Sequence, residues 1–246
     1  MQDDDRQVGR LLTRREVLAA LAAAGAAGAA GFVDGAAPLM AQVPACVVVP
    51  APTPGPYFVD EHLNRSDIRI DPADGKAVPG VDLDVSMRVM QIAADGRCLP
   101  LMGALVDLWQ CDALGVYSDV QDSRVGFDTR GRKFLRGHQT TDAMGQVKFT
   151  TIYPGWYQGR AVHLHFKVRT AANGPAAATE FTSQLYFDEK VTDVVHALPP
   201  YAGKGRRRTM NDQDGIYAKG GRQLMLQLRK QIRGYAGTFE LALTRA

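Results

Sequence analysis

The chain has 246 residues, of which 46% are hydrophobic and 22% charged, and its formal net charge is +3 at pH 7. This length and balance predict one globular domain with a substantial core. The small charge argues against nucleic acid or an anionic membrane surface as the main partner.

The first 41 residues are typical of a targeting segment rather than of a folded element. Arg14-Arg15 precedes an apolar run, rich in Ala and Gly, over residues 17–33. A basic start followed by a weakly apolar stretch indicates an export signal, and adjacent arginines fit the twin-arginine type. We therefore expect residues 1–41 to be removed, at a site the sequence leaves open, and residues 42–246 to form a periplasmic or secreted domain. Membrane contact is expected only through this signal, with an uncleaved anchor as the alternative.

The expected mature chain contains three cysteines, Cys46, Cys98 and Cys111. In an oxidising compartment, three cysteines allow one disulfide and one free thiol. We expect Cys46 to pair with Cys98, although the sequence leaves the pairing open.

Short β-strands follow a proline-punctuated, extended segment at residues 46–57. Each strand is predicted by apolar residues that alternate along one face, or by turn signals at the ends of a short apolar run. The predicted strands cover residues 83–89, 104–110, 146–152, 163–169 and 181–187, followed by a hairpin of residues 224–228 and 238–243. We find no long helical period after the signal. The pattern predicts an all-β fold, an antiparallel β-sandwich with long loops.

The strand at residues 163–169 carries two histidines on one face. His163 and His165 alternate with Leu164, Phe166 and Val168. Because successive side chains point to opposite faces, both imidazoles are expected to point away from the apolar core. Such a pair could bind a metal ion, but it is often only a polar outer face.

Two tyrosines follow turns that end near these histidines in the expected fold. Tyr117 comes after the strand at 104–110 and a turn in which Asp112 is interpreted as a turn residue. Tyr157 ends the turn Tyr153-Pro-Gly-Trp-Tyr, where proline and glycine force a change of direction. Phenolate is a hard anionic donor that suits ferric iron, whereas zinc prefers His, Cys and carboxylate ligands. Taken singly, each tyrosine has a simpler interpretation as a packed aromatic residue.

With these motifs, the chain resembles the intradiol ring-cleavage dioxygenases, especially the protocatechuate 3,4-dioxygenase group and its exported relatives. The resemblance covers most of the chain after the signal, and its motifs occur in order. They are Gly55-Pro56-Tyr57, the segment 100–118 ending in Gly-Val-Tyr-Ser118, Thr151-Ile-Tyr-Pro-Gly-Trp-Tyr157, Arg160-Ala-Val-His-Leu-His165 and Ser183-Gln-Leu-Tyr-Phe187.

The resemblance implies a non-haem ferric iron enzyme, with one Fe(3+) ion per chain. The implied reaction opens a catechol-type ring between its two hydroxylated carbons with O2 and gives a muconate-type diacid. Its partners would be a small aromatic diol and O2. Tyr157 would also leave the ion and take a proton, Arg160 would stabilise charge on the substrate, and Gln184 would lie near it. The implied metal ligands are Tyr117, Tyr157, His163 and His165.

The sequence identifies neither the substrate nor the oligomeric state. Tyr157 and His163 are only six positions apart, fewer than in the intracellular members of the family, so we expect a more open pocket and leave the catechol unassigned. The oligomeric state, including a homo-oligomer, is also left open. Two other functions compete: an exported, non-catalytic β-sandwich binding module, and a zinc-dependent hydrolase built on His163 and His165, for which no third ligand is evident.

Other polar residues receive no function. His62, His138 and His196 are interpreted as solvated or locally hydrogen-bonded, and Tyr57 as lining the cavity or packing in the core. The basic run formed by Lys204 and residues 206–208 is interpreted as a solvated loop, with an anion-binding lip as the alternative.

Overall fold

The computed structural model describes residues 57–93, 95–123, 126–171 and 178–244. The expected export signal and Cys46 lie outside the described residues. Cys98 is disulfide-bonded, and Cys111 is a free, buried thiol. Among the helices in the described part of the chain, none has the length and apolar character needed to cross a membrane.

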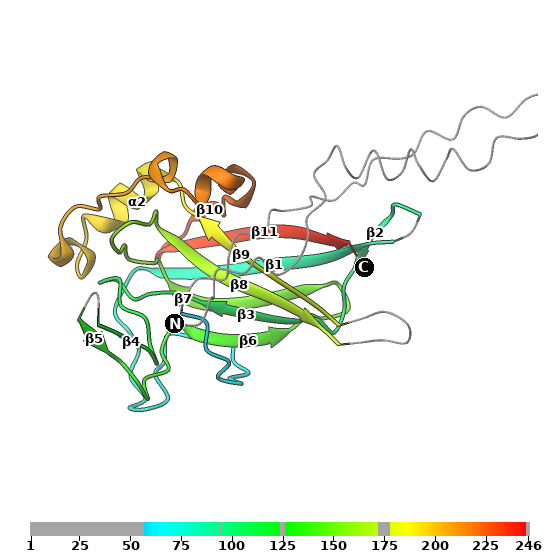
Figure 1. The fold of residues 1–246 in the computed structure, drawn as a ribbon, viewed down its shortest axis with the longest axis horizontal. Helices are drawn as coiled ribbons and strands as arrows, with labels where there is room; N and C mark the ends of the chain where they lie inside the picture. The colour runs from blue at the N-terminus through cyan, green and yellow to red at the C-terminus, as the bar shows by residue number, and fades with distance from the viewer. Residues whose placement is uncertain (1–56, 94, 124–125, 172–177, 245–246) are drawn as a thin grey trace, which may run out of the picture.

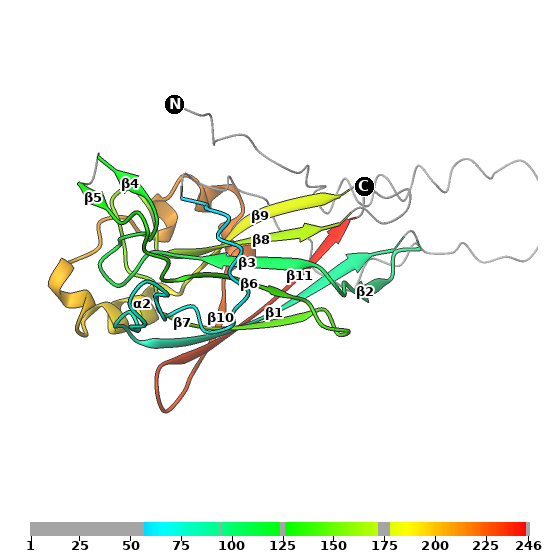
Figure 2. The same cartoon turned by 90° about the horizontal axis from the view of Figure 1, so that it is seen from below.

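Two β-sheets packed face to face form the body of the molecule (Figures 1 and 2). The first sheet contains β10 (Gln227–Lys230), β11 (Tyr235–Thr244), β1 (Asp82–Ile92), β2 (Cys98–Pro100) and β7 (Gln146–Ile152). The second has the order β6 (Arg136–Thr140), β3 (Leu105–Trp109), β8 (His163–Thr170) and β9 (Thr179–Tyr186). A small ribbon pairs β4 (Gln121–Asp122) with β5 (Phe127–Asp128). The all-β sandwich expected from the sequence is therefore confirmed.

Alternating burial explains why the long strands form where the sequence predicts them. In β1, the side chains of Leu83, Val85, Met87 and Val89 are at most 1% exposed, whereas Asp84 between them is exposed. A one-residue slip of the register would move this apolar row to the solvent side, so the burial pattern fixes the pairing. The other long predicted strands coincide with β3, β7, β8 and β9 to within about two residues at each end.

Among the paired strands of the described residues, one pair departs from the antiparallel expectation. β1 and β11 are parallel, with Leu83 opposite Tyr235 and Gln91 opposite Leu243. The predicted terminal hairpin is present as β10 and β11, and its strands are antiparallel. Alternation reports which face a residue occupies and not which way the strand runs, so the sequence pattern could not give this pairing. The hairpin also begins later than expected, because Leu224 belongs to a 3-10 helix.

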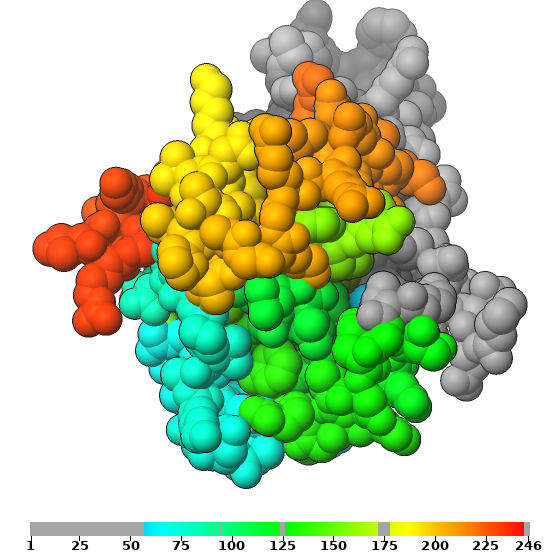
Figure 3. Space-filling model, turned by 90° about the vertical axis from the view of Figure 1, so that its left-hand side faces the viewer, coloured from blue at the N-terminus to red at the C-terminus, as the bar shows by residue number. Residues whose placement is uncertain are grey.

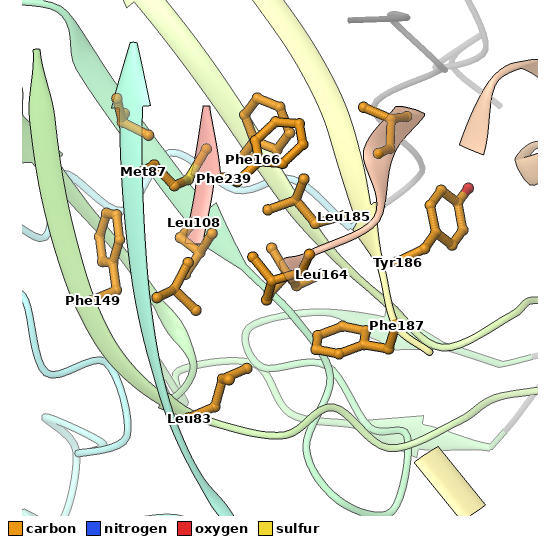
Figure 4. Packing of buried hydrophobic residues seen from close by; sticks show 14 of the residues in the cluster. Leu83, Met87, Leu108, Phe149, Leu164, Phe166, Leu185, Tyr186, Phe187 and Phe239 are labelled. Atoms are coloured by element: carbon orange, nitrogen blue, oxygen red, sulfur yellow. The ribbon is translucent and has the colours of Figure 1, made fainter. Parts of the chain in front are cut away.

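The core lies between the sheets, and Figure 4 shows its side chains interlocking. Met87 and Phe149 of the first sheet and Leu108, Leu164 and Phe166 of the second are each at most 1% exposed. Full burial of one such side chain contributes about 1.5–3 kcal/mol to folding. The core therefore makes β3 and β8 rigid supports for whatever their outer faces carry.

A helical segment covers one end of the sandwich, where β8 begins and β9 ends (Figure 1). Asp188 caps the N-terminus of α2 by accepting hydrogen bonds from the backbone N–H groups of Lys190 and Val191. The eight residues of α2 are too few for a clear helical period, so the sequence did not predict it. The segment consists of α2 (Glu189–His196), η2 (Tyr201–Lys204), η3 (Asn211–Gln213), η4 (Tyr217–Lys219) and η5 (Gly221–Leu224).

The basic run lies in this segment and is only partly a solvated loop. Arg206 and Arg208 are exposed, as expected. The side chain of Arg207 is only 5% exposed and forms ion pairs with Glu189 and Asp193 of α2. The interpretation as a solvated loop is therefore wrong for Arg207, which fastens the loop to the helix.

Candidate metal centre and active site

Four side chains converge at the end of the second sheet next to the helical segment. The Oη atom of Tyr117 lies 3.1 Å from Nε2 of His165, which lies 3.1 Å from Nε2 of His163. The Oη atom of Tyr157 lies 3.0 Å from the same His163 nitrogen. The structure therefore brings together all four side chains singled out in the sequence.

His163 and His165 are the first and third residues of β8. They point away from the face that carries Leu164 and Phe166, as alternation requires. The sequence reasoning left open a polar outer face, but both imidazoles are only 1% exposed. The ring of Trp109, on the neighbouring strand, stacks on His165 with a centroid distance of 4.8 Å and an interplanar angle of 7°.

Hydrogen bonding fixes which nitrogen of His163 faces the cluster. Its Nδ1 atom lies 2.7 Å from the carbonyl oxygen of Ala161 and can only donate to it. The lone pair of the neutral ring is therefore on Nε2, which faces Tyr157 and His165. Burial lowers the pKa of both His163 and His165, so both are neutral at physiological pH and suited to bind a metal.

Tyr117 is held by the chain that precedes and follows it. The Asp112 carboxylate accepts hydrogen bonds from the N–H groups of Leu114 and Val116, so its expected role in the turn is confirmed. After Tyr117, the buried guanidinium of Arg136 donates to the carbonyl and hydroxyl oxygens of Ser118. The phenol ring itself is only 1% exposed.

Tyr57, which could line the cavity or pack in the core, belongs to this aromatic cluster. Its ring stacks on that of Tyr117 with a centroid distance of 4.4 Å, and its hydroxyl donates to Asp122 at 2.5 Å. The stacking limits movement of the Tyr117 ring, so Tyr57 supports one side of the site.

Tyr157 is held at the end of a turn that the helical segment supports. His196 of α2 bonds through Nε2 to the carbonyl oxygen of Pro154 at 3.0 Å, and Trp156 donates from its indole to the carbonyl of Gly205. His196 was interpreted as solvated or locally bonded. The solvated alternative is wrong, because the residue is buried; the hydrogen-bonded one holds, with a partner that is 42 positions away in the sequence.

Desolvation raises the pKa of both Tyr117 and Tyr157 when no cation is among them. The positive charge of Arg160 opposes this effect at Tyr157. A bound cation would favour the phenolates far more strongly, since it is the largest local charge in such a site.

A second group of polar side chains borders the four. Arg160 donates from Nη2 to the Gln184 side-chain oxygen at 2.5 Å and to the Tyr186 hydroxyl at 3.4 Å. Gln184 and Tyr186 lie on β9, directly across from His165 and His163. The pKa of Arg160 is raised: burial acts against the cation, but Tyr157 and Asp214 favour it.

Sequence reasoning placed Arg160 and Gln184 near the substrate but missed Tyr186 and Asp214. The signal for Tyr186 was present, because it stands two positions after Gln184 and so shares its face of β9. Asp214 gave no signal, since it lies 54 positions from Arg160 in a loop without periodicity.

The arrangement of these donors fits one metal ion. Metal–nitrogen and metal–oxygen bonds of about 2.0–2.2 Å place adjacent ligand atoms about 3 Å apart, which matches the separations found here. The described residues contain no group of three or more His, Cys, Asp and Glu that could hold a metal. The donor set at this site is thus two imidazoles and two phenols, which is not a set that zinc prefers.

Comparison with known proteins places the chain in a family. A dioxygenase family model matches residues 53–199. The intradiol ring-cleavage dioxygenase of Tetranychus urticae is 30% identical, and the alignment covers 81% of this chain and 95% of that one with a TM-score of 0.68. The dioxygenase domain of a carbohydrate-binding fusion protein from Streptomyces sp. SirexAA-E is 29% identical, covering 81% and 100% with a TM-score of 0.55.

A third structure, 3-chlorocatechol 1,2-dioxygenase of Rhodococcus opacus 1CP, shares the fold at 21% identity, with coverage of 78% and 71% and a TM-score of 0.52. A search among curated proteins finds no significant match. The chain belongs to the intradiol ring-cleavage dioxygenase family.

Proposed function

We propose that this protein is a ferric non-haem iron dioxygenase, which opens a catechol-type ring between its two hydroxylated carbons with O2 and yields a muconate-type diacid. The observation that carries the proposal is the convergence of two phenol oxygens and two imidazole nitrogens, 3.0–3.1 Å apart, in a member of this family. Hard phenolate donors favour a trivalent ion over zinc. Tyr117, Tyr157, His163 and His165 would hold one Fe(3+) per chain.

When bound, the ferric ion would draw charge from a catecholate and so make a ring carbon reactive toward O2. The protein supplies the donors and their orientation. The Ala161 carbonyl holds the Nδ1–H of His163 and thereby aims Nε2. The indole of Trp109 keeps the ring of His165 in one plane.

Tyr157 is the group proposed to accept a substrate proton. It is only half-buried, whereas Tyr117 is 1% exposed and stacked on Tyr57. Tyr157 is therefore the phenol with more freedom to move away. Its Oη would take the proton of one catechol hydroxyl, which leaves the substrate anionic.

Arg160 is the cation proposed to stabilise negative charge on the reacting catechol. Gln184 and Tyr186 hold its Nη2 atom, so the guanidinium is fixed before the charge develops. Preorganised donors of this kind are worth about 2.7–4 kcal/mol of barrier.

We also propose that residues 1–41 direct export by the twin-arginine route to the periplasm or beyond. The adjacent Arg14 and Arg15 before a weakly apolar run support this. Replacing both arginines by lysine should retain the protein in the cytoplasm, as measured by fractionation, and unchanged export would contradict the proposal.

Metal analysis and oxygen uptake test the enzymatic proposal. The purified protein should contain about one iron per chain and have a red-brown tint from charge transfer between tyrosinate and iron. A panel of catechols should reveal at least one that drives oxygen uptake without added reductant. A colourless protein that contains zinc and consumes no oxygen would support the hydrolase alternative, and a metal-free protein that binds sugars or proteins would support the binding module.

A further inference from the structure

Asp214 has a buried carboxylate that touches two parts of the site at once. Its side chain is only 1% exposed. Its Oδ2 atom accepts hydrogen bonds from Nε of Arg160 at 3.0 Å and from the N–H group of Ala161 at 2.9 Å. Its Oδ1 atom accepts from the N–H group of Ile216 at 2.7 Å. Both oxygens are thus occupied, and the carboxylate has one orientation.

We propose that Asp214 is a positioning residue whose carboxylate sets the direction of the Arg160 guanidinium and the orientation of the His163 ring together. This inference rests on the proposed function, because it concerns the roles given there to Arg160 and His163.

The effect on Arg160 follows from its hydrogen bonds. Asp214 binds the Nε edge of the guanidinium, and Gln184 and Tyr186 bind the Nη2 atom. A planar group held at two edges cannot rotate about its own axis. Gln184 and Tyr186 are neutral acceptors, whereas the Asp214 carboxylate forms an ion pair with the guanidinium and so binds it more strongly. Without it, the cation would be buried beside neutral groups and would turn toward solvent.

The effect on His163 passes through one peptide unit. Asp214 accepts from the N–H group of Ala161, and the carbonyl of Ala161 accepts from Nδ1 of His163. The position of that carbonyl decides where Nε2 points. Partners of this kind, one bond beyond the metal ligands, orient the ligands and tune the metal.

The loop that carries Asp214 is itself anchored to the sandwich. Asn211 donates from its side chain to the carbonyl of Phe187 at 3.0 Å and from its backbone to Glu189 at 2.6 Å. Figure 3 shows the orange helical segment lying over the light-green loop that leads into β8. Asp214 therefore belongs to the anchored helical segment, whereas Arg160 and Ala161, which it binds, belong to the loop before β8.

The variant Asp214→Asn tests the proposal, because it keeps the size of the side chain and removes its charge. The matched control is Asp71→Asn. Asp71 also has a side chain that is 1% exposed, and it likewise accepts from an arginine Nε, that of Arg132, and from backbone N–H groups, those of Ala73 and Lys133. None of these partners belongs to the site. Any loss common to both variants therefore reports the cost of neutralising a buried carboxylate.

Three quantities are measured on both variants: turnover of a catechol per bound iron, anaerobic binding of the same catechol followed by the visible spectrum, and loss of iron to a chelator. In Asp214→Asn, we expect turnover per iron to fall about 10- to 100-fold and iron to leave faster. The dissociation constant of the catechol should change by less than about threefold, because Arg160 acts on charge that develops during the reaction. Asp71→Asn should match the wild type in all three quantities.

Wild-type turnover per iron and wild-type iron retention in Asp214→Asn would overturn the inference. If that variant does not fold, Asp214→Glu keeps the charge but shifts it by one methylene; it should show the same loss per iron, and unchanged turnover per iron in it would overturn the inference equally. If the wild type holds iron but cleaves no catechol, the proposed function fails instead. The chelator measurement then still tests the link between Asp214 and His163.

Discussion

At the scale of single residues, the site depends on pairs in which one side chain directs another. Trp109 fixes the ring plane of His165, and the Ala161 carbonyl fixes the tautomer of His163. Tyr117 is buried and stacked on Tyr57, whereas Tyr157 keeps an exposed part. This difference between the two phenols makes Tyr157 the residue on which substitution is most informative.

Replacing Tyr157 by phenylalanine should reduce kcat for catechol cleavage by about 100-fold or more, because the proposed proton acceptor is lost. The red-brown tint should shift or fade in the same variant, since one phenolate no longer contributes. The measurements are steady-state oxygen uptake and the visible spectrum at equal iron content.

The control for this variant is Tyr153→Phe in the same turn. The Tyr153 hydroxyl is also buried, but it bonds to Thr192 and not to the cluster. The Tyr153→Phe substitution should lower the free energy of unfolding by about 1 kcal/mol and leave both the tint and kcat unchanged. Full activity and an unaltered spectrum in Tyr157→Phe would show that Tyr157 is not a ligand.

At the scale of elements, α2 acts as a support for the turn that ends in Tyr157. His196 reaches from the helix to the carbonyl of Pro154, and its Nδ1 atom has no partner among the described residues. Burial lowers the pKa of this imidazole. The helix is therefore attached to the site through a group that must stay neutral.

Replacing His196 by glutamine should make the stability of the protein less dependent on pH in mild acid. The unfolded chain protonates His196 near its ordinary pKa of about 6.5, whereas the folded protein does so only at lower pH. The unfolded state thus binds more protons, and the stabilising contribution is lost as the pH falls. In His196→Gln, the slope of the free energy of unfolding against pH should decrease by up to about 1.4 kcal/mol per pH unit between about pH 6.5 and pH 5.

Denaturant unfolding at several pH values measures this slope. His62→Gln is the control, because the His62 side chain is 82% exposed. Equal slopes in the wild type and in His196→Gln would mean that His196 does not couple folding to pH.

Sequence patterns located the long strands of this fold but not the direction of its last strand or its short helix. Alternation located β1, β3, β7, β8 and β9, since burial of one face repeats every second residue. It could not show that β11 runs parallel to β1, nor detect an eight-residue helix. The Tyr and His motifs pointed to the site because phenol and imidazole donors suit one metal ion and because the motifs resemble those of the family in the same order. The contacts of Asp214 and Arg136 could not be predicted, because their partners are distant in sequence and lie in no periodic pattern.

At the level of the whole molecule, the sandwich holds half of the site, and the loops together with the helical segment hold the rest. The strands β3, β8 and β9 supply Trp109, both histidines and Gln184. The loops and the helical segment supply Tyr117, Tyr157 and Asp214. A metal ion bound among the four donors would join these parts. Its removal should therefore lower the stability of the fold as well as the activity.

Removal of iron should lower the thermal midpoint of unfolding. A ligand that binds only the folded state stabilises it by about 4 kcal/mol at a thousandfold excess over its dissociation constant. Calorimetry of the iron-loaded and chelated protein measures the difference, and readdition of ferric iron should restore it. Identical midpoints, with iron content verified, would show that no ion links the four side chains.

The fate of the two oxygen atoms of O2 shows whether the protein cleaves a catechol ring between its hydroxylated carbons. A catechol that the iron-loaded protein consumes is incubated under labelled dioxygen (18O2), and the product is analysed by mass spectrometry. We expect a cis,cis-muconate-type diacid that carries both atoms of one O2 molecule, with the ring broken between the two hydroxylated carbons. A product cleaved beside rather than between these carbons, or an unlabelled quinone, would contradict it.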